Sequence, residues 1–146
     1  MSWFSDPLAP GTPAPDFSLP DESGRLVTLS ALKGKNVVLV FYPGDDTPGC
    51  TRQLCAFRDQ WDLARKRNVE LYGINPQSSK SHEKFRRKFQ FPFPLLVDEG
   101  QRVAKLYNAS GLIIKRTVYL IDPNGLIRFA QRGSPKPAEV LSHLDN

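Results

Sequence analysis

The two cysteines, Cys50 and Cys55, are the side chains of this sequence best suited to chemistry, and the chain has no other cysteine. Both fall in one stretch, residues 42–61, where a strongly apolar run at residues 37–42 gives way to a helical pattern. Turn residues, a helix start and a thiol therefore coincide in a single segment. We expect the function of the protein to be centred there.

The first cysteine lies at a predicted helix start. Thr47 is suited to be the N-cap, with its hydroxyl accepting from the free N–H groups of the first turn, and Pro48 suits the first helical position. Cys50 is then the third helical residue, where unpaired N–H groups and the positive end of the helix dipole favour a thiolate. The alternative is a buried, inert cysteine. The sequence Thr-Pro-Gly-Cys at a helix start favours the reactive interpretation.

Local charge does not explain how this thiol would be activated. We expect Asp45 and Asp46 to offset the positive charges of Arg52 and Arg58 in the same stretch. A cation from a more distant segment is therefore required, and sequence spacing cannot identify it.

Cys55 follows five positions later on the same predicted helix. On an intact helix this spacing amounts to about 140° of rotation and about 7.5 Å of rise, which puts the two Cα atoms about 9 Å apart. A disulfide tolerates a Cα separation of only roughly 7 Å. If the two thiols pair, the helix start must unwind, so the pair would be a switch. A Cys55 that is merely packed in the helix stays open as the alternative.

The elements that must position these thiols alternate along the chain. Residues 37–42 are apolar and rich in β-branched side chains, which predicts a central strand buried on both faces. A helix of about eighteen residues, ending near Asn68, is expected after it. Further strands are predicted at residues 17–19, 26–29, 69–74, 95–97, 117–121 and 126–130, and further helices at 31–33 capped by Ser30, from Ser78 or Ser81 onward, at 101–107 and at 137–144.

This order predicts an α/β fold, a three-layer sandwich on a mixed sheet with a parallel core and a final antiparallel hairpin. The length of 146 residues fits one domain, residues 1–146, in which the proline-rich residues 1–15 form an extended arm. We find no secretory signal and no run long enough to span a bilayer. We therefore expect a soluble, cytoplasmic protein with no membrane partner.

Much of the net charge of +5 is concentrated in one short segment that contains Lys80, Lys84, Arg86, Arg87 and Lys88. Such a patch could attract nucleic acid or an acidic protein. A solvated helix face is the more common meaning of a charge run, so we expect no nucleic-acid partner. The two cysteines and two histidines of the chain also lack the spacing of a zinc site. No metal and no organic cofactor is expected.

Several motifs resemble those of the peroxiredoxins. Pro43-x-x-x-Thr47-x-x-Cys50 is similar to the peroxiredoxin active-site motif. The fuller stretch Tyr-Pro-x-Asp-x-Thr-Pro-Gly-Cys-Thr, followed by Cys55 and Ala-Phe-Arg-Asp, resembles the bacterioferritin comigratory protein (PrxQ) branch. The likeness covers nearly the whole chain and includes residues 14–19, 91–96 and 116–122.

The resemblance implies a thioredoxin-like fold and a thiol peroxidase. It implies that Cys50 is the peroxidatic cysteine and Cys55 the resolving one. By the same resemblance, Thr47 hydrogen-bonds the sulfur and the peroxide, and Pro43 shields the site from water. Arg116 matches the activating arginine of the family and would supply the distant cation, although the sequence alone would make it a solvent-facing strand residue.

The chain departs from the family pattern at Gln53, where the family usually has Glu, and at Gly44, which replaces a frequent Lys. A carboxylate at position 53 would partner the arginine. We expect its replacement by an amide to favour the Cys50 thiolate and to loosen Arg116.

The resemblance implies a peroxide substrate, a thioredoxin or glutaredoxin-type reductant and a monomer. Two rival functions remain at this point. One is a general thiol–disulfide oxidoreductase, disfavoured because the chain lacks a C-x-x-C pair. The other is a non-enzymatic peroxide sensor or scaffold whose oxidised form binds a partner.

Overall fold

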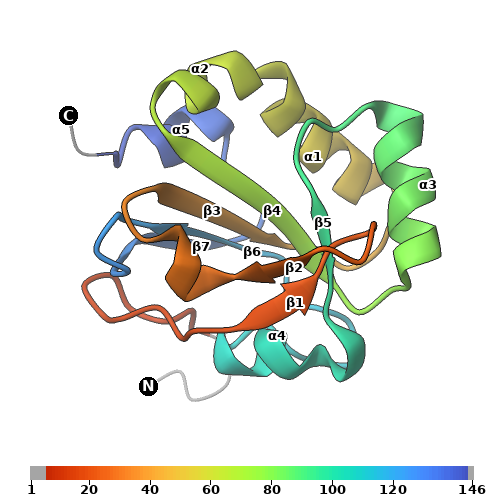
Figure 1. Ribbon diagram of the computed structural model, residues 1–146, viewed down its shortest axis with the longest axis horizontal. Helices are drawn as coiled ribbons and strands as arrows, with labels where there is room; N and C mark the ends of the chain where they lie inside the picture. The colour runs from red at the N-terminus through yellow and green to blue at the C-terminus, as the bar shows by residue number, and fades with distance from the viewer. Residues whose placement is uncertain (1–5, 145–146) are drawn as a thin grey trace.

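A five-stranded mixed sheet lies at the centre of the computed structural model, which describes residues 6–144 (Figure 1). Its strand order is β5-β4-β3-β6-β7. β3 runs parallel to β4, and β4 parallel to β5, whereas β6 is antiparallel to β3 and β7 to β6. The strands are β3 (Asn36–Phe41), β4 (Val69–Asn75), β5 (Leu95–Val97), β6 (Thr117–Ile121) and β7 (Ile127–Arg132). The predicted parallel core with a final antiparallel hairpin is confirmed.

One face of the sheet is covered by four helices, α1 (Pro48–Asp59), α2 (Trp61–Lys66), α3 (Ser79–Phe89) and α5 (Pro137–Leu141). Val38 and Val40 of β3 point to this face and pack with Leu54 and Phe57 of α1 and with Phe85 of α3. The helical spacing of the apolar residues in α1 therefore serves to bury the side of the helix that also carries Cys50.

The other face carries shorter elements: the hairpin of β1 (Ser18–Pro20) and β2 (Leu26–Thr28), the 3₁₀ turns η1 (Leu29–Leu32) and η2 (Glu99–Gln101), and α4 (Arg102–Leu106). Leu39 and Phe41 of β3 point to this side and pack with Tyr107 and Tyr119. Figure 1 shows α4 and the β1–β2 hairpin on the side of the sheet away from α1 and α2. Because alternate residues of β3 enter two cores, the predicted three-layer arrangement is confirmed.

The predicted arm falls partly outside the described residues, since residues 1–5 are not described. From residue 6 onward it runs along the hairpin of β6 and β7. The Gly11 N–H donates to the Ile127 carbonyl at 2.7 Å, and the Ala14 N–H donates to the Gly125 carbonyl at 2.9 Å. Within residues 6–144, no helix is long and apolar enough to cross a membrane.

The structure corrects three details of the predicted elements. The long helix after β3 is two helices, because the chain turns at Gln60, whose N–H donates to the Phe57 carbonyl and not one residue further back. After the turn, α2 runs in a new direction, and Trp61 at its start packs on Phe93, with ring centroids 5.8 Å apart. The one-turn helix starts at Leu29 and is not capped by Ser30. The third predicted helix, residues 101–107, is shorter than expected, because the 3₁₀ turn η2 takes up Gln101 and α4 covers only Arg102–Leu106.

Candidate active site around Cys50

Cys50 is the third residue of α1 and is fully buried. The helix begins just after β3, so the thiol lies beyond the carboxyl end of a strand whose two neighbours run on either side of it. This is the edge at which open α/β sheets bind ligands. The predicted position of the thiol in the first helical turn is confirmed.

Arg116 provides the distant cation that the sequence required. Its Nη2 donates to Cys50 Sγ at 3.2 Å, although 66 positions separate the two residues. The sheet closes this separation. Thr117, the first residue of β6, pairs with Phe41 at the end of β3, so the preceding arginine comes beside the start of α1. The position that sequence alone would assign to solvent is half-buried against the thiol.

Gln53 holds the same arginine from the helix side. Its Oε1 accepts a hydrogen bond from Arg116 Nη1 at 2.7 Å, and its Nε2 donates to the Gly133 carbonyl at 3.3 Å. The Gly133 N–H in turn donates to the Arg116 carbonyl at 2.8 Å. An amide at position 53 thus keeps the hydrogen bond that a carboxylate would make, without adding a negative charge. Whether the missing charge loosens Arg116 stays a prediction.

Thr47 occupies the N-cap position with extended backbone angles, but its side chain makes no capping hydrogen bond. Its hydroxyl donates instead to the Gly44 carbonyl at 3.1 Å. The predicted cap position is right and the predicted hydrogen bond is wrong. The N–H groups of a first helical turn have no acceptor within the helix, so those around Cys50 can serve an oxygen that approaches the sulfur.

Pro43 is half-buried in the loop between β3 and α1. It lies two residues after the end of β3 and four residues before Thr47. The structure thus brings Cys50 and Arg116 into direct contact, whereas the shielding role of Pro43 and the peroxide contact of Thr47 stay predictions.

The sequence reasoning missed a buried network below this loop. The carboxylate of Asp45 accepts hydrogen bonds from Tyr42 Oη at 2.6 Å and from Ser81 Oγ at 2.7 Å. It also lies 2.6 Å from His82 Nδ1, and the other ring nitrogen of His82 lies 2.8 Å from the Leu96 carbonyl. Both ring nitrogens of His82 thus lie within hydrogen-bond distance of an oxygen, one on the loop and one on β5. The loop before Cys50 is therefore tied to α3 and β5.

The network also sets the protonation of Asp45. Burial alone would raise the pKa of its carboxyl, but hydrogen bonding and charge from His82, with hydrogen bonds from Tyr42 and Ser81, outweigh it and lower the pKa below the usual 3.8. A lowered folded-state pKa stabilises the fold above the ordinary value, and this contribution is lost as the pH falls through the lowered one.

The two acidic residues of the loop do not offset the nearby arginines, which corrects the expected charge balance. Asp45 is engaged by His82, and Asp46 Oδ2 lies 2.8 Å from Lys88 Nζ. Arg58 pairs with its neighbour Asp59 and donates to the Phe89 carbonyl. Asp45 and Asp46 therefore contact side chains of α3, and the loop does not neutralise the positive charges around Cys50.

Cys55 lies further along α1 and is partly buried. Both cysteines are free thiols, and α1 runs unbroken through both positions. Burial raises the pKa of the Cys55 thiol above its ordinary value, only partly countered by the positive charge of Arg58. The second cysteine is therefore mostly a protonated thiol while the helix is intact.

The basic segment lies on α3 and is largely paired. Arg86 Nη1 lies 2.8 Å from a Glu22 oxygen, Arg87 lies near Glu83, and Lys88 pairs with an acid of the active-site loop. These pairs support the interpretation as a solvated helix face. Among residues 6–144, no group of three or more His, Cys, Asp or Glu side chains could hold a metal ion.

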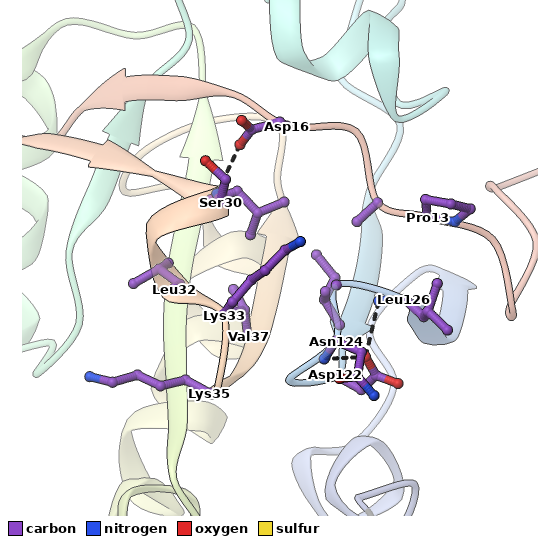
Figure 2. Close-up of a pocket in the computed structure, with 14 residues that line it drawn as sticks. Pro13, Asp16, Ser30, Leu32, Lys33, Lys35, Val37, Asp122, Asn124 and Leu126 are labelled. Carbon is purple, nitrogen blue, oxygen red and sulfur yellow. Dashed lines mark hydrogen bonds between the residues drawn. The ribbon is translucent and has the colours of Figure 1, made fainter.

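A pocket of about 410 Å³ lies at the far end of β3 from Cys50 and is not part of this site (Figure 2). Val37, at the start of β3, and Lys33 line it. Its two carboxylates, Asp16 and Asp122, already accept backbone N–H groups of adjacent turns. Both carboxylates of the pocket are thus already held by backbone donors.

Comparisons with known proteins agree with this geometry. The model of the AhpC/TSA family matches residues 10–130. The chain is 42% identical to a chloroplastic peroxiredoxin Q of Sedum lineare over 139 residues, covering 92% of this chain and 73% of the relative. It is 44% identical to a peroxiredoxin bcp of Coxiella burnetii, covering 80% of this chain and 83% of that protein.

The chain spans 64% of the length of the chloroplastic peroxiredoxin Q of Oryza sativa subsp. japonica, to which it is 40% identical over 92% of its own length. Among solved structures, peroxidoxin BcpB of Mycobacterium tuberculosis superposes with a TM-score of 0.85 at 30% identity, covering 92% of this chain and 94% of that one. A PrxQ mutant of Xylella fastidiosa superposes with a TM-score of 0.84 at 26% identity, covering 94% of both chains.

The thioredoxin-like fold that the sequence resemblance implied is confirmed by these superpositions. Family, fold and the placement of the first cysteine agree, and the chain belongs to the AhpC/TSA family, in its peroxiredoxin Q (bacterioferritin comigratory protein) branch.

Proposed function

We propose that the protein is a thiol-dependent peroxidase that reduces hydrogen peroxide and organic hydroperoxides, with Cys50 as the peroxidatic cysteine. The observation that carries the proposal is the hydrogen bond from Arg116 Nη2 to the buried Cys50 Sγ, 3.2 Å long. A guanidinium this close favours the thiolate, which is the nucleophilic form of cysteine.

In the first step the Cys50 thiolate attacks one oxygen of the peroxide. A sulfur–oxygen bond forms, the oxygen–oxygen bond breaks, and the leaving oxygen takes a proton and departs as water or an alcohol. Cys50 becomes a sulfenic acid. Arg116 and the N–H groups of the first turn stabilise the negative charge that develops on the oxygens. The Thr47 hydroxyl joins them by turning its one hydrogen from the Gly44 carbonyl to the peroxide, while Pro43 keeps water away.

In the second step Cys55 resolves the sulfenic acid. The first turn of α1 unwinds and the Cys55 sulfur attacks the Cys50 sulfur. The hydroxyl of the sulfenic acid takes the thiol proton of Cys55 and leaves as water, which leaves an intramolecular disulfide. The unwinding is required because the two thiols diverge on an intact helix. An external dithiol then restores both thiols by exchange, and thioredoxin or a glutaredoxin-type protein is the proposed donor.

The cytoplasmic location and the monomeric state belong to this proposal as expectations. The plant relatives are named as chloroplastic proteins, so location within the branch varies. Gel filtration of the reduced protein tests the monomer.

The mass of the intact protein after one equivalent of hydrogen peroxide tests the function. We expect the wild type to lose two hydrogens, Cys55→Ser to gain one oxygen at Cys50, and Cys50→Ser to stay unoxidised. Oxidation centred on Cys55 would contradict the assignment. With thioredoxin present, slow and substoichiometric turnover would favour a peroxide sensor, and reduction of protein disulfides as fast as peroxide would favour a general oxidoreductase.

A further inference from the structure

A second pocket, of about 490 Å³, adjoins the active site and shares Arg116 and Gln53 with it. One wall is a face of α1, with residues three and four positions apart. The opposite wall is the segment 134–137, which enters α5. The residues of the α1 wall are Gly49, Arg52, Gln53 and Ala56. The pocket is therefore built from the same helical turns that carry Cys50.

The charge of this pocket is positive throughout. Arg52, Arg116 and Lys136 line it, and no acidic side chain is among its lining residues. Within residues 6–144, the side chains of Arg52 and Lys136 make no ion pair or hydrogen bond. Three cations thus line one cavity with no counter-ion among its lining residues, so the cavity favours an anion.

Gln53 explains why the charge is uncompensated. Its amide occupies the position where the family pattern has a carboxylate, and it satisfies Arg116 Nη1 by a hydrogen bond without neutralising it. A guanidinium has five N–H donors, and the contacts with Gln53 and Cys50 use one at each terminal nitrogen. Arg116 therefore keeps donors for a ligand in the pocket.

We propose that this pocket binds a small oxyanion, a phosphate or carboxylate group, and that the bound anion holds the start of α1 in its helical form. The second part follows from the construction of the pocket: unwinding from Gly49 to Gln53 would remove one wall and separate Arg52 from Lys136. A ligand that binds only the helical form favours it by mass action. The anion would then slow formation of the Cys50–Cys55 disulfide, and this consequence rests on the proposed function.

The binding part is tested on the reduced protein, with inorganic phosphate and acetate as probes and sodium chloride at equal ionic strength as the reference. Backbone amide NMR shifts of Gly49, Ala56 and residues 134 and 136 should change with saturation. A stronger response to phosphate than to acetate identifies a dianion site, and the reverse order a carboxylate site. Shifts no larger than those in chloride would overturn the proposal.

Three variants locate the site. Lys136→Gln removes one cation at the surface, and Gln53→Glu places a carboxylate in the pocket; each should weaken phosphate binding about tenfold or more. Lys80→Gln is the matched control, since it removes the same charge from the exposed start of α3 and should bind phosphate like the wild type. If Lys80→Gln and Lys136→Gln weakened phosphate binding equally, the effect would depend only on the net charge of the protein, and the proposed binding site in the pocket would be wrong.

The coupling to α1 is tested by repeating the phosphate titration on the peroxide-oxidised disulfide form. We expect weaker binding than in the reduced form by about tenfold or more, and equal binding would overturn the coupling. A protein that forms no disulfide with peroxide would contradict the proposed function, while the titration of the reduced protein would still decide the pocket.

Discussion

The loop before Cys50 is held in place by buried contacts, whereas the start of the helix after it is held weakly. The loop is anchored by Asp45, whose carboxylate is 3% exposed and lies against the fully buried His82. The helix starts with a threonine that makes no capping hydrogen bond, followed by Pro48 and Gly49. Glycine is a weak helix former. From this difference we expect the site to move on its helix side while the loop stays in place.

Burial limits how far that movement extends. Leu54 and Phe57 of α1 lie in the core with 0% and 4% exposure. Unwinding past them would expose large apolar side chains, each contributing roughly 1.5–3 kcal/mol through burial. The first turn, up to about Gln53, can therefore unwind without this cost, and that is the part which separates the two thiols.

The largest effect is expected from breaking the anchor of the loop. His82→Ala removes the imidazole that lies 2.6 Å from the buried Asp45 carboxylate, and leaving a buried carboxylate without its partner costs about 3–5 kcal/mol. Urea unfolding of the reduced protein measures the loss. Lys88→Ala is the matched control, because it breaks an exposed pair to Asp46 in the same loop and should cost less than about 1 kcal/mol. If both variants lost the same unfolding free energy, the buried contact would not anchor the loop, and the contrast between an anchored loop and a weakly held helix start would not stand.

A second effect concerns the pH dependence of the helix side. Burial raises the pKa of the Cys55 thiol, so below that pKa its thiolate fraction rises about tenfold per pH unit. We expect the rate of disulfide formation after a peroxide pulse to rise steeply between about pH 6 and pH 8. The oxidation of Cys50 is measured separately in Cys55→Ser, so that the pH dependence of the second step can be isolated. A disulfide rate that does not change with pH would contradict Cys55 as the attacking thiol.

The smallest effect is expected from strengthening the helix start. Thr51 lies in the first turns of α1, and Thr51→Ala raises helix propensity by roughly 0.5 kcal/mol. Disulfide formation should slow about twofold in stopped-flow measurements, while the oxidation of Cys50 in a Cys55→Ser background should keep its rate. A slower oxidation step would instead indicate that Thr51 acts on the thiol itself.

The sequence could predict the structural features that depend on residues close to one another along the chain. The apolar run of β3, the proline after Thr47 and the glycine before Cys50 indicated a buried strand, a helix start and a thiol in its first turn. Arg116 depends on the register of β6 against β3, which spacing does not encode, and only the family resemblance indicated it. The turn at Gln60 was missed because the apolar spacing continues across it.

Asp45 and His82 illustrate the same limit. Each is an ordinary polar residue when considered alone, and they meet only because α3 packs beside the loop. Asp45 belongs to the Tyr-Pro-x-Asp part of the active-site stretch, which was the available signal. No pattern in the sequence pointed from it to a histidine 37 positions away.

Hydrogen exchange on the reduced and disulfide forms tests the comparison most directly. In the reduced protein the Thr51 N–H donates to the Thr47 carbonyl at 2.8 Å, and the His82 N–H donates to the Ser78 carbonyl at 3.0 Å. We predict that the amide of Thr51 loses protection in the disulfide form while that of His82 keeps it. A Cys50–Cys55 disulfide with Thr51 still protected, or an equal loss at both amides, would contradict a fixed loop beside a releasable helix.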